Sequence, residues 1–97
     1  ATIVLRALGP SLASANVSGT LADPSMTIYD ANGAIIAADD NWQDDMNSVQ
    51  VEQNGLAPTN DLESATVLHP PSGAYSVIVT GTDGTEGVSL FELYDLD

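Results

Sequence analysis

Apolar and polar residues alternate along most of this chain. This alternation is the pattern of strands that bury one face and expose the other. Four stretches show it most clearly, at residues 2–8, 26–28, 65–67 and 75–79. The pattern therefore predicts β-strands over most of the chain.

The last apolar stretch, residues 88–96, has a different pattern. Val88 and Leu90 alternate with a serine, and Phe91 and Leu93 then follow on the opposite parity. Apolar residues of both parities are typical of a strand that is buried on both faces. We expect this strand to be covered on both sides.

Turn residues separate the predicted strands. Asn32-Gly33 tolerates positive φ and suits a tight hairpin, and Asp83-Gly84 offers a second turn. The spacing predicts an all-β fold, a jelly-roll-like β-sandwich of about six to eight short antiparallel strands. We expect residues 1–97 to form a single domain.

One short surface helix is predicted at residues 44–54. Asp44 or Asp45 can accept hydrogen bonds from the first amides of the helix. Gly55 suits the left-handed residue that ends it, with Leu56 folding back on Val51.

Size limits the core that this chain can form. It has 97 residues, of which 43% are hydrophobic and 15% charged, as in a small globular domain. Such a small domain often depends on disulfides, metals or partner subunits. The sequence has no cysteine, so a metal or a partner remains.

The charge balance excludes several partners. Arg6 is the only lysine or arginine against 14 acidic residues, and the net charge is −13. Nucleic acids and anionic membrane surfaces require basic side chains, so neither is an expected partner. No stretch approaches the roughly 20 apolar residues of a membrane span, so no membrane insertion is expected. The absence of lysine, with abundant small polar residues, favours an extracellular or cell-surface bacterial protein.

Residues 39–45, DDNWQDD, concentrate four carboxylates around the only tryptophan. Calcium prefers six to eight oxygen ligands, and Asp30 can approach this segment across the Asn32-Gly33 hairpin. The spacing is not that of an EF-hand loop. The alternative is a solvated turn that caps a helix, with Trp42 as a core anchor. The candidate ligands for Ca²⁺, the one cofactor considered, are Asp30, Asp39, Asp40, Asn41, Asp44 and Asp45.

Arg6 lies within a predicted strand and is expected to be partly buried. A buried guanidinium requires a carboxylate or carbonyl partner. We therefore predict a structural ion pair, with Asp23, Asp30 or Glu63 as its acid.

The sequence offers no catalytic constellation. His69 is the only histidine, and no G-x-S-x-G segment or other activated-serine context accompanies it. We expect no enzymatic activity. Asn16-Val17-Ser18 is an N-x-S sequon in a predicted loop, which makes Asn16 a possible glycosylation site.

Long consecutive motifs support a resemblance. They are RALGPSL (6–12), LADPSMTIYDANGAIIAADDNW (21–42), GLAPTNDLESA (55–65) and PPSGAYSVIVTGTDGTEGVSLFELYDLD (70–97). The chain resembles a β-sandwich repeat module of large secreted bacterial surface proteins. The resemblance implies surface display, a β-sandwich fold and no established enzymatic activity.

In such modules another apolar strand segment usually precedes the RALGPSL part, so we expect the sandwich to lack a strand. An unpaired edge must be covered, and a strand from a neighbouring copy can cover it. The expected donor is the opening strand, with the FELYDLD segment as an alternative donor or acceptor. The predicted intersubunit strand residues are Thr2, Ile3, Val4, Leu5, Ala7 and Leu8.

These features favour a structural function. The first hypothesis is a subunit of an extracellular bacterial filament or fibre, a homopolymer assembled head-to-tail by strand contribution. The alternative is a calcium- or carbohydrate-binding module within a large secreted adhesin, in which Trp42 and Tyr29 are exposed and contact glycans. A third class is an accessory domain of a secreted hydrolase.

Overall fold

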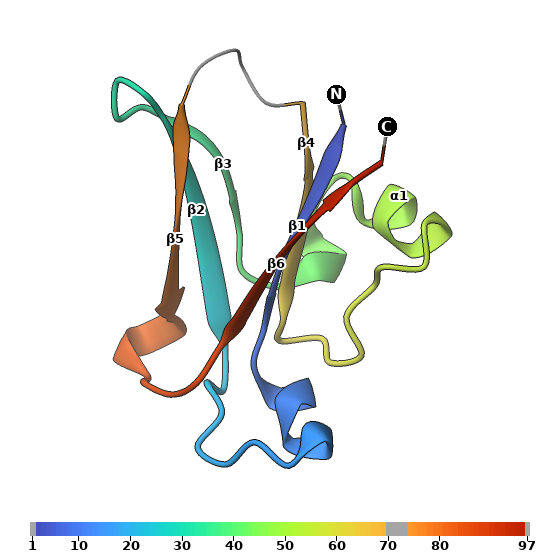
Figure 1. Cartoon of the computed structure of the whole chain (residues 1–97), viewed down its shortest axis with the longest axis vertical. Helices are drawn as coiled ribbons and strands as arrows, with labels where there is room; N and C mark the ends of the chain where they lie inside the picture. The colour runs from blue at the N-terminus through green and yellow to red at the C-terminus, as the bar shows by residue number, and fades with distance from the viewer. Residues whose placement is uncertain (1, 70–73, 97) are drawn as a thin grey trace.

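Two small antiparallel sheets make up the protein (Figure 1). The structure, a computed structural model, describes residues 2–69 and 74–96. The strand order is β4-β1-β6 in one sheet and β3-β2-β5 in the other. The two sheets pack face to face, so the predicted all-β sandwich is confirmed.

The strands are short, and brief helical segments lie between them. In chain order the elements are β1 (Ile3–Leu8), η1 (Pro10–Ala15), β2 (Pro24–Asp30), β3 (Ile35–Asp39), η2 (Trp42–Asp44), α1 (Ser48–Gln53), β4 (Ser64–Leu68), β5 (Tyr75–Gly81), η3 (Thr82–Gly84) and β6 (Leu90–Asp95).

Only one connection is a hairpin. β2 and β3 are joined by the predicted turn, where Gly33 has φ of +82° and its amide donates to the Asp30 carbonyl. The other connections cross from one sheet to the other (Figure 1). Gly84, also at positive φ, lies in the crossing from β5 to β6.

The main core lies between the sheets. Leu5 of β1 faces Met26 and Ile28 of β2, and all three are fully buried. β2 and β5 alternate as predicted, so their intervening residues point away from this core, whereas β1 and β4 are buried at nearly every position.

A second core covers the outer face of the β4-β1-β6 sheet. There Val4 of β1 packs with Ala65, Trp42 and Val51 of α1. β1 is therefore apolar on both faces because it lies between two cores. Figure 1 shows α1 on the side of this sheet that faces away from the other sheet.

The helix ends as predicted but begins later. Gly55 has φ of +71°, and the Leu56 amide donates to the Val51 carbonyl at 3.1 Å. Residues 42–44 form η2, and Asp45 Oδ1 accepts the Asn47 amide in a separate turn. The residues predicted to form the first turn of the helix instead belong to η2 and to this separate turn, so α1 starts at Ser48.

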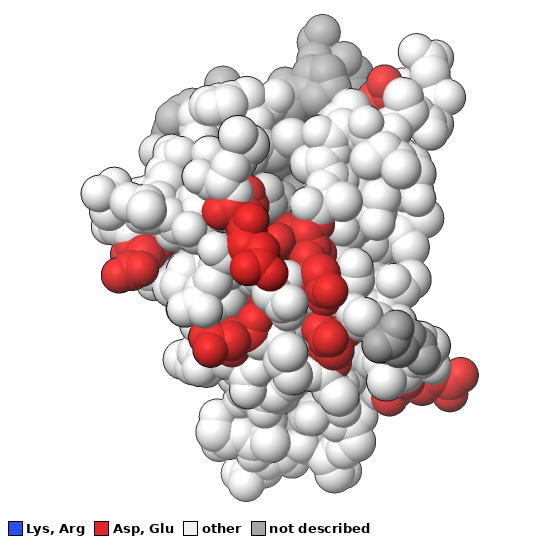
Figure 2. All heavy atoms as spheres, turned by 180° about the vertical axis from the view of Figure 1, so that it is seen from behind, with Lys and Arg blue, Asp and Glu red and all other residues white. Residues whose placement is uncertain are grey.

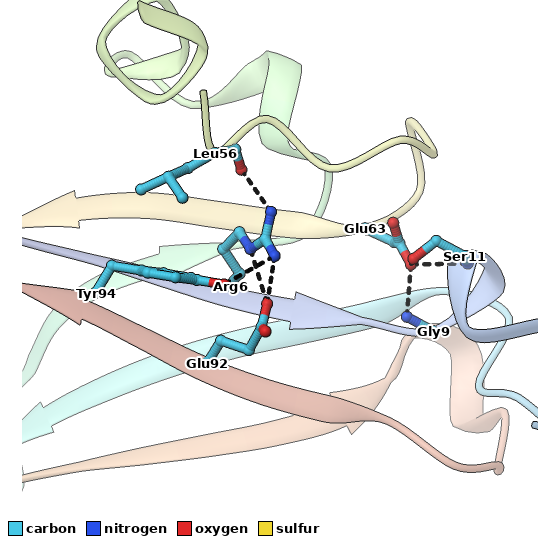
Figure 3. Close-up of polar contacts among 7 residues, drawn as sticks. All are labelled: Arg6, Gly9, Ser11, Leu56, Glu63, Glu92 and Tyr94. Carbon is cyan, nitrogen blue, oxygen red and sulfur yellow. Dashed lines mark hydrogen bonds and ion pairs between the residues drawn. The ribbon is translucent and has the colours of Figure 1, made fainter. Parts of the chain in front are cut away.

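Arg6 ties three segments together on the outer face of β1 (Figure 3). Its Nε donates to Glu92 Oε1 at 3.0 Å, and its Nη2 forms an ion pair with the same carboxylate. Nη1 donates to the Leu56 carbonyl at 3.0 Å, and Nη2 donates to the Tyr94 hydroxyl at 3.2 Å. The partner is thus Glu92, not one of the three acids expected from the sequence.

Glu63 anchors the chain that leaves β1. It is fully buried, and its Oε2 accepts the amides of Gly9 and Ser11 at 2.7 and 3.0 Å and the Ser11 hydroxyl at 2.6 Å (Figure 3). A carboxylate at amides that open a helical turn satisfies donors that the turn cannot pair itself. A Cβ on Gly9 would lie 2.0 Å from the Leu21 carbonyl oxygen, so only glycine fits this turn.

We predict that Arg6→Ala lowers the free energy of unfolding by about 2–4 kcal/mol, since it leaves Glu92 and the Leu56 carbonyl without their partner. Glu92→Gln keeps an acceptor oxygen and is expected to cost about 1 kcal/mol. Urea denaturation measures both values.

The matched control is Glu52→Gln on the exposed face of α1. It is expected to change the free energy by less than about 0.5 kcal/mol. Equal effects of Glu92→Gln and Glu52→Gln would show that the arginine network contributes nothing specific.

Candidate functional site

The sandwich is closed along one side and open along the other. On the closed side, loop residues bridge β3 and β4: the Trp42 amide donates to the Glu63 carbonyl at 2.9 Å, and the Ala65 amide donates to Asp39 Oδ2 at 2.8 Å. On the open side, β5 pairs only with β2, and β6 pairs only with β1, among the described residues. We call this open side, formed by the edges of β5 and β6, the open edge.

Apolar side chains of the inner face are exposed at the open edge. Phe91 and Leu93 stand opposite Ala7 and Leu5, so they lie on the core side of their sheet. They are nevertheless 39% and 47% exposed. The prediction that this strand is covered on both sides is wrong, because Phe91 and Leu93 on one face and Leu90 on the other are all exposed.

The backbone of the same residues faces outward along β6. The Leu96 amide donates to the Thr2 carbonyl at 2.9 Å, which marks a hydrogen-bonded pair. Such pairs alternate along an antiparallel ladder. Tyr94 and Glu92 therefore bond toward β1, while the amides and carbonyls of Phe91 and Leu93 point to the free edge.

β5 has the same arrangement. The Thr82 amide donates to the Asp23 carbonyl at 2.9 Å, so in the same alternation the backbone groups of Val77 and Val79 point away from β2. Their side chains are half-buried against the main core. β5 also has no charged residue.

The predicted intersubunit strand occupies the opposite kind of position. β1 is the central strand of its sheet and is paired along its length on both sides within the same chain. It therefore has no free edge to give to a neighbour, and the donor role expected of it is not supported. The residues concerned, Thr2, Ile3, Val4, Leu5, Ala7 and Leu8, lie in or directly before this strand.

The acidic loop forms a separate candidate site. A shallow pocket of about 310 Å³ opens beside it. Asn41 lines this pocket, and its buried Oδ1 has no hydrogen-bond partner among the residues that the structure describes. Figure 2 shows acidic side chains gathered near the middle of the face opposite to that of Figure 1. The pocket is lined by Ser25, Ala38, Asp39, Asp40, Asn41 and Asp44.

Four of the six predicted calcium ligands line this pocket, and two do not. Asp30 Oδ1 instead accepts the amides of Asn32 and Ala34 within the hairpin. Asp45 Oδ1 accepts the Asn47 amide, and its Oδ2 is buried. Across the described residues, no group of three or more acidic, histidine or cysteine side chains is arranged to hold a metal ion.

Asp39 is the acid most affected by its surroundings. It is 8% exposed, and burial raises its pKa to about 6, with smaller contributions from the nearby charges of Asp45 and Asp40. Its bond from the Ala65 amide opposes this rise. Asp40 is tied differently, because its Oδ1 accepts the Thr82 hydroxyl at 2.9 Å.

The remaining candidates lie on the surface. Asn16 is exposed at the end of η1 with φ of +66°, so its side chain is accessible. His69 is also exposed, and its Nδ1 lies 3.3 Å from the Thr2 hydroxyl. Trp42 is only 7% exposed and packs in the second core, as a core anchor does.

The role of one structural residue was missed in the sequence, and one sequence pattern was misinterpreted. Glu63 looks like any surface acid in a loop, and its role depends on Gly9 and Ser11, more than fifty positions away. The change of parity at Phe91 was visible in the sequence. It marks an edge strand whose inner side chains are only partly covered by the core, and not a strand that is buried on both faces.

No family model, curated protein or solved structure matches this chain. No helix within residues 2–69 and 74–96 has the length and apolar character of a membrane span. The function must therefore be argued from the two sites themselves.

We predict that protein stability falls as the pH rises through the pKa of Asp39. Because the pKa of Asp39 is raised, the folded state binds its proton more tightly than the unfolded state does. Protonation of Asp39 therefore stabilises the folded protein at low pH, and this stabilisation is lost as the pH rises to about 6 and above. Between about pH 5 and about pH 7.5 the loss from this group is about 1 kcal/mol.

The measurement is urea denaturation at both pH values in chelator-containing buffer. Asp39→Asn should remove this part of the pH dependence, while Asp44→Asn, on an exposed side chain of the same pocket, should retain it. An unchanged slope in Asp39→Asn would rule out Asp39 as its source.

Proposed function

We propose that this chain is a structural subunit of an extracellular bacterial filament or fibre, in which a strand from one copy is laid on the open edge of the next. The observation that supports this most is the exposure of Phe91 and Leu93 on the inner face of an unpaired edge strand. Among the described residues of one molecule, their side chains are only partly covered and their outward backbone groups face no further strand.

An added strand would satisfy both needs together. Its backbone would pair with the outward amides and carbonyls of Phe91 and Leu93, and each net hydrogen bond contributes about 0.5–1.5 kcal/mol. Apolar side chains at every second position would cover the same two residues and the half-buried Val77 and Val79. The expected donor is thus an extended segment with apolar alternation.

Charge permits this contact between copies. β5 has no charged residue, Glu92 of β6 is neutralised by Arg6, and Asp95 lies at the far end of β6. Between Leu90 and Tyr94 the open edge therefore lets a chain of net charge −13 approach another with little direct repulsion. A donor site and an acceptor site that lie at different places on the subunit give a contact that does not close on itself, so it extends into a filament.

The two other edges are less suited to an added strand. β3 has an irregular register opposite Ile28 and Tyr29, which is one way in which proteins protect an edge. β4 is in contact with α1 and β3 along the closed side. This contrast supports the open edge as the assembly site.

The first test is Leu93→Lys, which places a charge on the inner face of the open edge. We expect electron microscopy of the purified wild-type protein to show fibres, and the variant to lose them, because the lysine prevents an apolar strand from seating. Val49→Lys is the matched control, since Val49 is 64% exposed on α1, whose main strand contacts are with β4 rather than with β5 or β6 of the open edge.

Monodisperse wild-type particles at every concentration would disprove the filament. Fibres that persist in Leu93→Lys and vanish in Val49→Lys would move the assembly contact to α1.

Calcium binding at the acidic pocket is the second candidate function. The buried, unpartnered Asn41 Oδ1 favours it, because hard oxygen atoms without donors suit a cation of this type. Asp39, Asp40 and Asp44 line the same pocket, but the described residues do not place three acids together to hold an ion, so these side chains would have to converge when calcium binds. Carbohydrate binding has weaker support, because Trp42 is buried and cannot stack on a sugar.

Calcium is expected to raise the melting temperature of the wild-type protein by several degrees, because a ligand that binds only the folded state stabilises it. Magnesium at the same concentration, and calcium with Asp44→Asn, should have much smaller effects. Calorimetric titration without heat, together with an unchanged melting temperature, would leave the loop as solvated surface.

A further inference from the structure

Two asparagines in this chain are followed directly by glycine, at Asn32-Gly33 and Asn54-Gly55. An asparagine side chain cyclises when the backbone nitrogen of the next residue attacks its amide carbon, Cγ. Glycine has no Cβ to obstruct this attack, and its backbone reaches more conformations than that of any other residue. The two dipeptides have the same chemistry, so any difference in their reactivity arises from the fold.

The attacking nitrogen is held in the same way at both sites. The Gly33 amide donates to the Asp30 carbonyl at 3.0 Å, and the Gly55 amide donates to the Glu52 carbonyl at 3.0 Å. Both glycines have positive φ, and both dipeptides are exposed to water. Each nitrogen must leave one hydrogen bond before it reacts, so the nucleophile does not separate the two sites.

The side chains that would be attacked are held differently. Asn54 is the C-cap of α1, and its Nδ2 donates to the Gln50 carbonyl at 2.8 Å. No such bond holds the Asn32 side chain among the described residues, where only the backbone amide of Asn32 is engaged, with Asp30 Oδ1 at 2.9 Å. The Asn32 side chain is therefore free to turn its Cγ toward the Gly33 nitrogen.

We propose that Asn32 is a site of spontaneous deamidation and that the cap of α1 protects Asn54. The Gly33 nitrogen gives up its proton and forms a bond to Asn32 Cγ, and the side-chain nitrogen takes up a proton and leaves as ammonia. Water then opens the resulting cyclic imide at either of its carbonyls. One opening leaves aspartate at position 32, and the other leaves isoaspartate, in which the backbone runs through the former side chain. Water is the only co-reactant.

The isoaspartate product would disturb the β2-β3 hairpin, because its backbone is longer by one methylene group. Asp30 closes this turn: its Oδ1 accepts the amides of Asn32 and Ala34 at 2.9 Å each, and its carbonyl accepts the Gly33 amide. A longer link cannot keep all three bonds in their present geometry. Either product also adds a carboxylate near Asp30 in a chain of net charge −13. Deamidation should therefore weaken the pairing of β3, an edge strand, with β2.

The test is incubation of the folded wild-type protein at mildly alkaline pH, followed by peptide mapping with mass spectrometry. Asn32 should convert several-fold faster than Asn54, since one net hydrogen bond corresponds to a factor of about 2–10 in rate. In concentrated urea the two sites should convert at similar rates, because neither turn is then present. The proposal needs only the hairpin and water, so it does not depend on the proposed function.

Two variants make the test specific. Asp30→Ala removes the carboxylate that fixes the turn, so it should speed the conversion of Asn32 and leave that of Asn54 unchanged. Asn32→Gln is the matched control, because the longer side chain cyclises much more slowly. After incubation the wild-type protein should melt at a lower temperature than before, whereas Asn32→Gln should keep its melting temperature.

Equal conversion of the two asparagines in the folded protein would overturn the proposal, and so would faster conversion of Asn54. Conversion of Asn32 in urea but not in the folded protein would show that the hairpin protects this site, which contradicts the proposal in the same way.

Discussion

A single half-buried guanidinium sets the arrangement of the first sheet. Arg6 lies on the central strand, and the carboxylate that it contacts among the described residues, Glu92, stands directly across from it on β6. A one-residue slip of β6 would place an apolar residue against the guanidinium and turn the inner side chains of β6 outward. The ion pair therefore selects the register that directs Phe91 and Leu93 toward the other sheet.

The use of β1 as a central strand explains where the molecule is incomplete. β4 and β6 pair with its two edges, and the two cores cover its two faces. The unpaired backbone groups therefore lie on the outer strands, and those of β5 and β6 form the open edge, beyond which the described chain has no further strand. The proposed assembly through the open edge rests on this distribution of pairing.

Local patterns predicted the parts of the fold that depend on neighbours in sequence. The hairpin at Gly33 and the helix end at Gly55 each need a positive φ, and glycine at these positions made both visible. The strands were found from alternation. These features require no knowledge of what lies across the sheet.

Contacts between distant residues were not accessible in the same way. The partner of Arg6 is 86 positions away, and the sequence contains 14 acids that could serve. The candidate calcium ligands illustrate the same difficulty, because Asp30 and Asp45 each use an oxygen for a nearby backbone amide before any pocket forms. Which acidic side chains come to lie close together depends on how the loops run from one sheet to the other.

The pairing of Thr2 with Leu96 brings the two ends of the chain together (Figure 1). Any peptide fused at either terminus, such as a purification tag, would start at the same end of the sandwich, next to the last residues of β6. A tag there can fold back along β6 and cover the exposed side chains of Phe91 and Leu93. Preparations with and without a tag can therefore differ in their state of association although the domain itself is unchanged.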